Sequence, residues 1–272
     1  MSREAEVVAA SERPVTPADV AVAIRAVGVE PGSTVIVHSS LSRVGWVVGG
    51  AIGVVSGLLD AVGTDGTIVM PAQTGVSDPS TWQNPPVPES WWPVIRATWP
   101  AFDPRLTPMR AMGAVAECFA RLPEAVHSGH PAVGFVAHGP LAGELMHPHD
   151  LEAGLGDDSP LGRLYERATR IVLIGVGHGN DTSLHLAEHR ADWPGKPWGR
   201  DGAPMTVDGE RHWVEYGRLA HDDEDFETIA AAFEAAGGEQ RRAPLGHATV
   251  TSCAMRPLID FAVEWMSAHR GR

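Results

Sequence analysis

Apolar and polar positions along the first seventy residues follow two different periods, which predict helices and buried strands in turn. A Thr-Pro-Ala-Asp start predicts a helix from Thr16 to Gly28, with the threonine as N-cap and the glycine at its C-terminal end. Apolar residues recur at helical spacing over 51–62, which predicts a second helix. Short apolar runs at 34–38 and 67–70 flank it and predict buried strands. Strand, polar turn, helix and strand together are typical of a βαβ unit.

The rest of the chain continues this pattern and adds an irregular segment. Residues 71–108 have no clear period and are rich in Pro and Trp, which is typical of a functional loop or of a lid that merely covers core. The later pattern predicts helices over 111–121, 182–190, 226–236 and 255–268, strands over 170–175 and 247–252, and a hairpin over 199–217. We expect an α/β domain over 14–272, with a mixed sheet and helices on both faces, after a flexible lead over 1–13.

Charge and cysteine content narrow the class of protein. The formal net charge of −13 argues against nucleic acid and anionic membranes as partners, and it favours a cationic small molecule, although plain solubility explains it as well. Cys118 and Cys253 do not form a CxxC pair, so a reducing compartment is the default. The N-terminus lacks an apolar signal-peptide core, and no apolar run approaches the ~20 residues of a membrane span. We therefore expect a cytoplasmic protein.

The strongest local group of chemically active residues follows the predicted strand at 170–175. After a glycine-rich turn come Asp181, His185 and Glu188, which at 3.6 residues per turn project from one face of a helix. A carboxylate beside an imidazole fixes its tautomer and stabilises the imidazolium, which makes His185 a candidate general base. Ordinary surface charge pairs, or an N-cap beside a satisfied histidine, explain the same pattern.

The turn after the first predicted strand is the second candidate. His38, Ser39, Ser40 and Leu41 offer hydroxyl groups and amides that can hold phosphate oxygens, while a simple serine-rich loop is the alternative. No GxxxxGK[ST] loop is present, and residues 175–179 form only GxGxG, so nucleotide hydrolysis and NAD dependence are poorly supported.

Histidines and acidic residues at 147–158 are weaker signals. His147 and His149 form an HxH pair near Asp157 and Asp158, but no HExxH motif or second ligand set accompanies them, so we expect no required metal. The same stretch contains a good helix start, with Ser159 as N-cap before a proline. A GxSxG elbow is absent, which argues against a serine hydrolase.

Several of these segments, in this order, resemble the aminoglycoside 3-N-acetyltransferases of the antibiotic N-acetyltransferase superfamily. The matching stretches are 37–41, 63–74, 112–117, 127–131, 158–161 and 181–188. The resemblance implies a three-layer α/β fold, distinct from the GNAT fold, in which acetyl-coenzyme A and the antibiotic meet in a cleft. Residues 71–108 and 199–217 would be insertions around that cleft. Gly129 and the Trp-rich stretch over 82–99 depart from the usual family pattern, which concerns antibiotic preference more than the chemistry.

The resemblance also implies roles for individual residues. His185 would act as general base, held by Glu188 or another acid such as Asp181. Contacts with coenzyme A would come from His38, Ser39, Ser40, Leu41, Thr74, Ser128 and His130. His147 and Asp157 or Asp158 would lie near the amine.

The implied reaction is direct attack of an aminoglycoside 3-amino group on acetyl-coenzyme A, by a monomer or homodimer. A backbone amide of the turn after the first strand would hold the oxyanion, and Asp157, Asp158, Asp181 and Glu188 would receive further ammonium groups. The alternatives are an acyltransferase of the same fold acting on another amine, a non-catalytic binder of cationic molecules, and a metal-dependent hydrolase.

Overall fold

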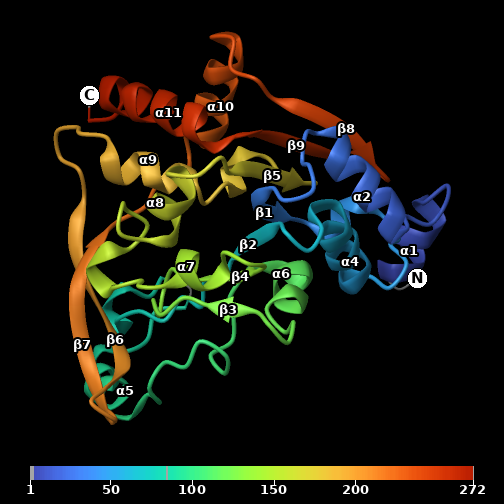
Figure 1. Cartoon of the computed structure of the whole chain (residues 1–272). Coiled ribbons are helices and arrows are strands. Elements are labelled where there is room, and N and C mark those ends of the chain that lie inside the picture. Colours follow the sequence, from blue (N-terminus) through green and yellow to red (C-terminus); the bar gives the residue numbers. More distant parts are fainter. Residues whose placement is uncertain (1–2, 84, 272) are drawn as a thin grey trace.

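A mixed sheet forms the centre of the protein. The computed structural model describes residues 3–83 and 85–271, and in that part of the chain seven strands form one sheet in the order β3-β4-β2-β1-β5-β9-β8 (Figure 1). β1 is parallel to both of its neighbours, and the other pairs are antiparallel. The bounds are β1 Thr34–Ser39, β2 Thr67–Pro71, β3 Val126–His127, β4 Phe135–His138, β5 Arg170–Ile174, β8 Arg241–Leu245 and β9 Ala248–Ala254.

Helices cover both faces of this sheet because alternate strand residues point to opposite sides. In β1, Val35 and Val37 belong to the core under α2 and α4, whereas Ile36 belongs to the opposite core. The first layer contains α2 Pro17–Ala26, α4 Ala51–Val62 and α6 Gly113–Phe119. The second contains α7 Ala142–Met146, α8 Pro160–Tyr165, α9 Leu184–Arg190, α10 Phe226–Ala235 and α11 Met255–His269. The predicted three-layer α/β arrangement is confirmed.

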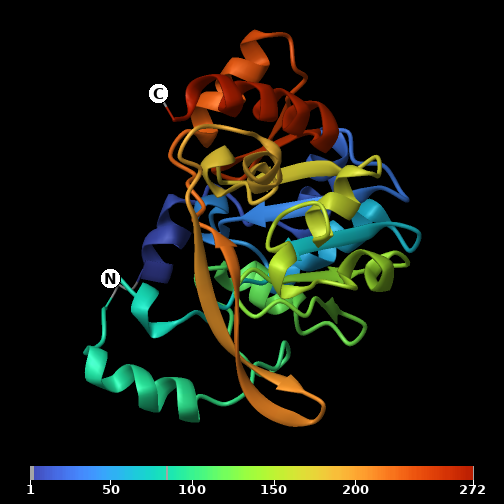
Figure 2. The ribbon, with the colours of Figure 1, turned by 90° about the vertical axis from the view of Figure 1, so that its left-hand side faces the viewer.

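The predicted hairpin is present and packs against the Trp-rich insertion. β6 Trp198–Val207 and β7 Glu210–Leu219 form a separate two-stranded sheet that extends beyond the central sheet (Figure 2). Residues 71–108, expected to be irregular, contain α5 Trp92–Thr98 and two short 3₁₀ turns. The Asp78 amide donates to Asp201 Oδ1 (2.6 Å), and the Phe102 amide donates to the Pro204 carbonyl (2.7 Å). The two insertions therefore support each other.

The N-terminal segment differs from the flexible lead expected over 1–13. Its described part contains α1 Arg3–Ala10, and the hydroxyl of Ser11 accepts a hydrogen bond from the Trp46 amide (3.1 Å). An ion pair between Arg13 and Asp19 (2.8 Å) continues this attachment to the start of α2. Residues 1 and 2 lie outside the described part of the chain.

The structure confirms the predicted helix caps but contains short strands that the sequence did not predict. Thr16 and Ser159 cap α2 and α8 with their side chains, as the sequence predicts. The strands β3, β4 and β8 have no counterpart in the sequence prediction, because they are short and depend on pairing with distant partners. Among the described residues, no helix is both long enough and apolar enough to span a membrane.

Gly57 lets α2 and α4 approach closely. A Cβ atom at this position would lie 2.5 Å from Val20 Cβ and 2.5 Å from the Pro17 carbonyl oxygen. Neither backbone nor a β-branched side chain yields easily at that distance.

We expect Gly57→Ala to lower the free energy of unfolding by ~1–3 kcal/mol through this clash, measured by chemical denaturation. Gly143→Ala is the matched control, because its Cβ in α7 would meet no atom within 4 Å. That change should leave stability unaltered or raise it by up to ~1 kcal/mol. Equal stability of the two variants would contradict the proposed close approach.

Candidate active site

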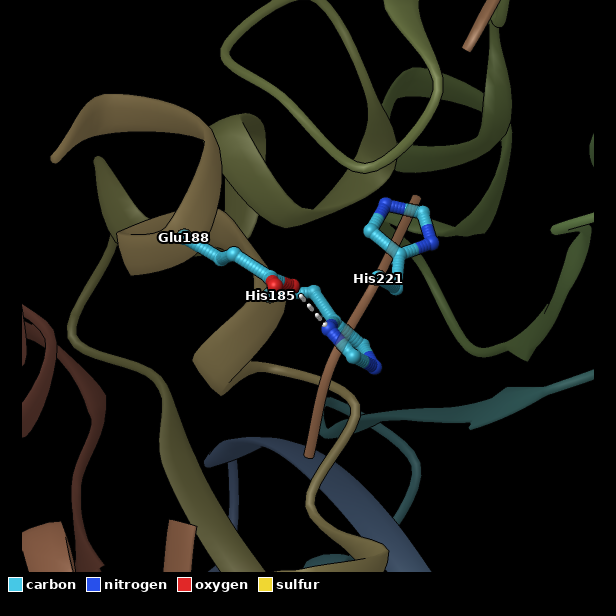
Figure 3. Close-up of side chains that lie close together, drawn as sticks. All are labelled: His185, Glu188 and His221. Atoms are coloured by element: carbon cyan, nitrogen blue, oxygen red, sulfur yellow. Dashed lines mark hydrogen bonds and ion pairs between the residues drawn. The ribbon is translucent and has the colours of Figure 1, made fainter. Parts of the chain in front are cut away.

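A histidine–glutamate pair on α9 forms the centre of the site. His185 Nδ1 lies 2.7 Å from Glu188 Oε2, one helical turn away (Figure 3). The Glu188 side chain is fully buried, whereas 14% of the His185 side chain is exposed. Because Nδ1 donates to the carboxylate, Nε2 of His185 keeps a lone pair that can accept a proton. The predicted contact between the two residues is confirmed.

Glu188 is held by groups from other parts of the chain. Its Oε1 accepts hydrogen bonds from the Asp222 amide (2.8 Å) and from Arg270 Nη1 (2.7 Å). Arg270 also pairs with the Asp225 carboxylate (2.6 Å). Burial raises the pKa of Glu188, but its hydrogen bonds with His185, Arg270 and the Asp222 amide outweigh burial and keep that pKa below its ordinary value. A full negative charge therefore lies beside the imidazole.

Asp181 does not share a helix face with this pair, so that part of the prediction is wrong. The helix begins at Leu184, and Asp181 lies before it, after a 3₁₀ turn. Its Oδ2 contacts His178 Nδ1 (2.9 Å), and its Oδ1 accepts from the Ser183 amide (3.1 Å). Helical spacing does not apply before the helix begins, which is why Asp181 meets His178 instead of His185.

A cavity of about 680 Å³ opens in front of His185. Its walls come from the 71–108 insertion, the 130–133 and 152–155 loops, α9 and the end of the hairpin. Thr74 and His130, both predicted to bind coenzyme A, line this cavity together with His185. Glu152 supplies the only carboxylate among the described lining residues, and its Oε2 accepts from the Gly217 amide (3.0 Å).

A second hollow, a groove of about 890 Å³, lies at the ends of β1 and β5. Ser39, Ser40 and Leu41 line it, as does Arg43. His38 lines a smaller cavity that shares Ser39 with the groove, and its Nε2 accepts from the Thr182 amide (3.0 Å). Burial lowers the pKa of His38 to about 4, so its ring is neutral at pH 7. Most of the residues predicted to bind coenzyme A thus divide between this end of the sheet and the cavity in front of His185.

Ser128 has a different position from the other predicted coenzyme A contacts. It is buried and lines neither hollow; its Oγ accepts from the Phe135 amide (2.8 Å). His149 Nε2 lies 2.7 Å from the Gly154 carbonyl and donates to it, so Nδ1 accepts from the Ser128 hydroxyl (3.0 Å). These contacts tie the β3–β4 hairpin to the loop at 149–154.

The residues predicted to lie near the amine are not brought to the cavity. His147, Asp157 and Asp158 are exposed and line none of the described hollows. Asp157 pairs instead with Arg190 (2.6 Å), and both aspartates precede the Ser159 cap of α8. Asp181 and Glu188 are buried and already paired. The structure therefore does not place these four carboxylates where they could receive the further ammonium groups of a substrate in this cavity, as was expected from the sequence.

Two further histidines, His189 and His221, line the cavity, and the sequence did not predict either as a site residue. His189 Nε2 lies 3.1 Å from His221 Nε2, and the ring centroids of His185 and His221 are 4.6 Å apart. Burial lowers the pKa of His189 to about 4 and that of His221 to about 2. His189 follows His185 by four residues on one helix face, and this spacing could have indicated that His189 belongs to the site. His221 is distant in sequence, so no local pattern could have indicated it.

Comparison with known proteins gives consistent matches. The sequence model of the family aminoglycoside 3-N-acetyltransferase matches residues 36–267. The SPbeta prophage-derived aminoglycoside N(3')-acetyltransferase-like protein YokD of Bacillus subtilis is 43% identical over 244 residues, 89% of either chain. Aminoglycoside N(3)-acetyltransferase VIII of Streptomyces fradiae is 36% identical over 280 residues, which cover 98% of this chain and 97% of that protein.

Solved structures agree with these relatives. The crystal structure of YokD superposes with a TM-score of 0.94 at 40% identity, covering 97% of this chain and 98% of that one. A binary complex of AAC-IIIb with CoASH superposes with a TM-score of 0.85 at 27% identity, covering 95% of this chain and 98% of that one. Sisomicin-bound AAC-VIa superposes with a TM-score of 0.83 at 29% identity, covering 94% of this chain and 99% of that one.

We expect Ser128→Ala to lower the free energy of unfolding by ~1–3 kcal/mol, because the Phe135 amide and His149 Nδ1 would lose a buried partner. Ser56→Ala, at an exposed position of α4, is the control and should not destabilise the protein. Calorimetric titration with coenzyme A should give the same affinity for Ser128→Ala as for the parent. Tenfold weaker binding would support the coenzyme A contact implied by the resemblance.

Proposed function

This chain belongs to the aminoglycoside 3-N-acetyltransferase family, a family of acyltransferases, and we propose that it moves the acetyl group of acetyl-coenzyme A to the 3-amino group of a 2-deoxystreptamine-type aminoglycoside. The observation that carries this proposal is the His185–Glu188 pair, whose imidazole lines a cavity large enough for a small-molecule amine. The relatives with bound CoASH and sisomicin support both substrates.

His185 acts as general base in the proposed reaction. Its Nε2 removes a proton from the acceptor amine, while Nδ1–H stays bound to Glu188, whose charge stabilises the imidazolium. The neutral amine attacks the thioester carbonyl, the new N–C bond forms, and the C–S bond breaks. The leaving thiolate takes the proton held on His185 Nε2, which restores the base, and the nitrogen of the new amide loses its remaining extra proton to water. The acetyl group passes directly from sulfur to nitrogen, so no acetylated side chain is needed. A base placed in this way typically contributes ~10²–10⁴-fold to the rate.

The groove at the ends of β1 and β5 is the proposed binding site of coenzyme A. Ser39, Ser40 and Arg43 present hydroxyl and guanidinium groups there, which suit phosphate oxygens. The Ser40 amide already donates to the Ile174 carbonyl (2.9 Å), so the next amides, of residues 41 and 42, are the candidate donors to the oxyanion. Thr74 and His130, in the cavity in front of His185, would lie toward the acetyl end.

Glu152 is the proposed partner of an acceptor ammonium group, in place of the aspartates expected from the sequence. The indole rings of Trp82 and Trp99 pack edge to face in the same cavity, with centroids 5.5 Å apart. Aromatic faces also attract cations. Charge and ring stacking together would orient the sugar amine toward His185.

An acyltransferase acting on another amine is the second candidate, and the charges of the cavity favour it. Arg110 and Arg218 line the cavity with Glu152, so the protein's net charge of −13 is not concentrated there. An acceptor with few ammonium groups suits such a cavity better than a polycation does.

We expect His185→Asn to lower kcat by ~10²–10⁴-fold while the affinity for coenzyme A stays near that of the parent, because the base is lost and the groove is untouched. Thiol release from acetyl-coenzyme A with a panel of aminoglycosides measures turnover, and mass spectrometry of the product places the acetyl group. Near-normal turnover of this variant would rule out His185 as the base.

Glu152→Gln is the matched contrast to His185→Asn. It removes a charge from the acceptor cavity without touching the histidine–glutamate pair, so we expect a raised KM for the aminoglycoside with kcat largely retained. Loss of kcat alone in this variant would speak against the assigned role of Glu152.

Arg270 is a positioning residue for Glu188 in this mechanism. We expect Arg270→Gln to lower kcat by about tenfold or more with little change in either KM, since Glu188 loses a charged hydrogen-bond partner. Arg256→Gln is the control, because that residue of α11 contacts Glu166 (3.2 Å) and the Tyr165 carbonyl (3.1 Å) at the surface and not Glu188. Equal kcat values for the two variants would show that the hydrogen bond from Arg270 to Glu188 is not needed for turnover.

A further inference from the structure

A small cavity of about 90 Å³, lined by His38, Ala116 and Thr182 among others, lies beside the groove at the ends of β1 and β5. We propose that this small cavity receives the acyl group of the thioester, and that His38 Nδ1–H donates a hydrogen bond to the thioester carbonyl oxygen. This inference rests on the proposed function, because it takes the groove as the binding site of coenzyme A.

The small cavity connects the two larger hollows. It shares five lining residues with the groove, namely Ser39, Ala111, Met112, Val176 and Asn180. Thr182, in its wall, accepts a hydrogen bond from the His185 amide through its carbonyl (3.2 Å). Pro71 is also in its wall, and Gln73, two residues later, lines the cavity in front of His185. A thioester whose coenzyme A part lies in the groove can therefore place its acyl group here, close to an amine beside His185.

The volume of the small cavity suits an acetyl group. Water occupies ~30 Å³ per molecule in the liquid, so a cavity of about 90 Å³ holds about three groups of that size. An acetyl group brings a methyl carbon, a carbonyl carbon and an oxygen. Val37 and Ala116 offer apolar surface to the methyl group, and His38 offers a polar group to the oxygen.

Nδ1 of His38 is a buried donor without a partner. His38 Nε2 accepts from the Thr182 amide (3.0 Å), so the proton of the neutral ring lies on Nδ1. Only 7% of His38 is exposed, and among the residues that the structure describes Nδ1 has no hydrogen-bond partner. An unpaired buried donor is costly and rare in proteins. A group that receives its partner only when the substrate binds accounts for it.

A donor at this position favours the transition state over the bound substrate. Negative charge develops on the carbonyl oxygen as the amine attacks, and a fixed donor stabilises that charge without reorganisation. Because burial holds the pKa of His38 at about 4, the ring is neutral and donates a hydrogen bond without giving up its proton. Proton transfer stays with His185. His38 thus adds a side-chain donor to the proposed backbone donors at residues 41 and 42.

Two substitutions at His38 separate the roles of its two nitrogen atoms. A glutamine oxygen can replace Nε2 and accept from the Thr182 amide, but glutamine has no donor at the position of Nδ1. An asparagine nitrogen can replace Nδ1 as donor, but asparagine does not reach the Thr182 amide. We expect His38→Gln to lower kcat by ~10²–10³-fold with parent-like affinity for coenzyme A, and His38→Asn to lower it by less than about tenfold.

The control is His212→Gln, at an exposed position of β7 that lines none of the described hollows. It should have the kcat of the parent. Parent-like kcat in His38→Gln, or a larger loss in His38→Asn than in His38→Gln, would overturn the proposal.

Infrared difference spectroscopy tests the hydrogen bond without turnover. Acetyl-coenzyme A labelled with ¹³C at the thioester carbonyl is bound to the full-length protein with no acceptor present. We expect the carbonyl stretch at a lower frequency in the parent and in His38→Asn than in His38→Gln, because a hydrogen bond weakens the C=O bond. Equal frequencies in all three proteins would refute the role of His38, whereas failure of acetyl-coenzyme A to bind at all would contradict the proposed function as well.

The length of the acyl chain tests the cavity itself. Hexanoyl-coenzyme A should give a kcat/KM at least tenfold lower than acetyl-coenzyme A with the same acceptor, because the longer chain exceeds the volume beside His38. Equal kcat/KM values would show that the acyl group lies elsewhere.

Discussion

A buried carboxylate is the constraint on which the site depends. Glu188 is inaccessible to solvent, and its charge is satisfied by His185 on its own helix, by the Asp222 amide and by Arg270 near the C-terminus. Removing one partner from such a group leaves an uncompensated charge in the protein interior, at a cost of several kcal/mol. The three segments must therefore come together before Glu188 can hold the His185 imidazole, so the position of this side chain depends on the completed fold.

The sheet explains why the two hollows lie near each other. β1 and β5 are parallel neighbours, so the turns that follow them emerge at the same edge of the sheet. The turn after β1 lines the groove, and the turn after β5 leads into α9, which bears His185. The hydrogen bond from the Thr182 amide to His38 joins these two turns directly. In the proposed reaction, a thioester in the groove and an amine in the cavity would meet because these two strands run in the same direction.

The charge of the whole chain proved a poor guide to the charge of the cavity. Of the acidic side chains expected to receive ammonium groups, Asp157 pairs with Arg190, Asp158 is exposed before the Ser159 cap of α8, and Asp181 and Glu188 pair with histidines. The cavity has instead a carboxylate at Glu152, indole rings and several neutral imidazoles. The proposed recognition of an amine in this cavity would therefore depend on shape and on few charges.

The sequence by itself determined the local parts of this protein. The caps at Thr16 and Ser159, the helix over 51–62, the buried strands and the His185–Glu188 contact all follow from side chains within one or two turns of each other. Only the tertiary structure decided that Arg270 and His221 join the site, that Glu152 lines the cavity and that Ser128 lies outside it. Periodicity reports which face of one element is apolar, whereas these contacts depend on how distant elements pack, and no local pattern of residues encodes that.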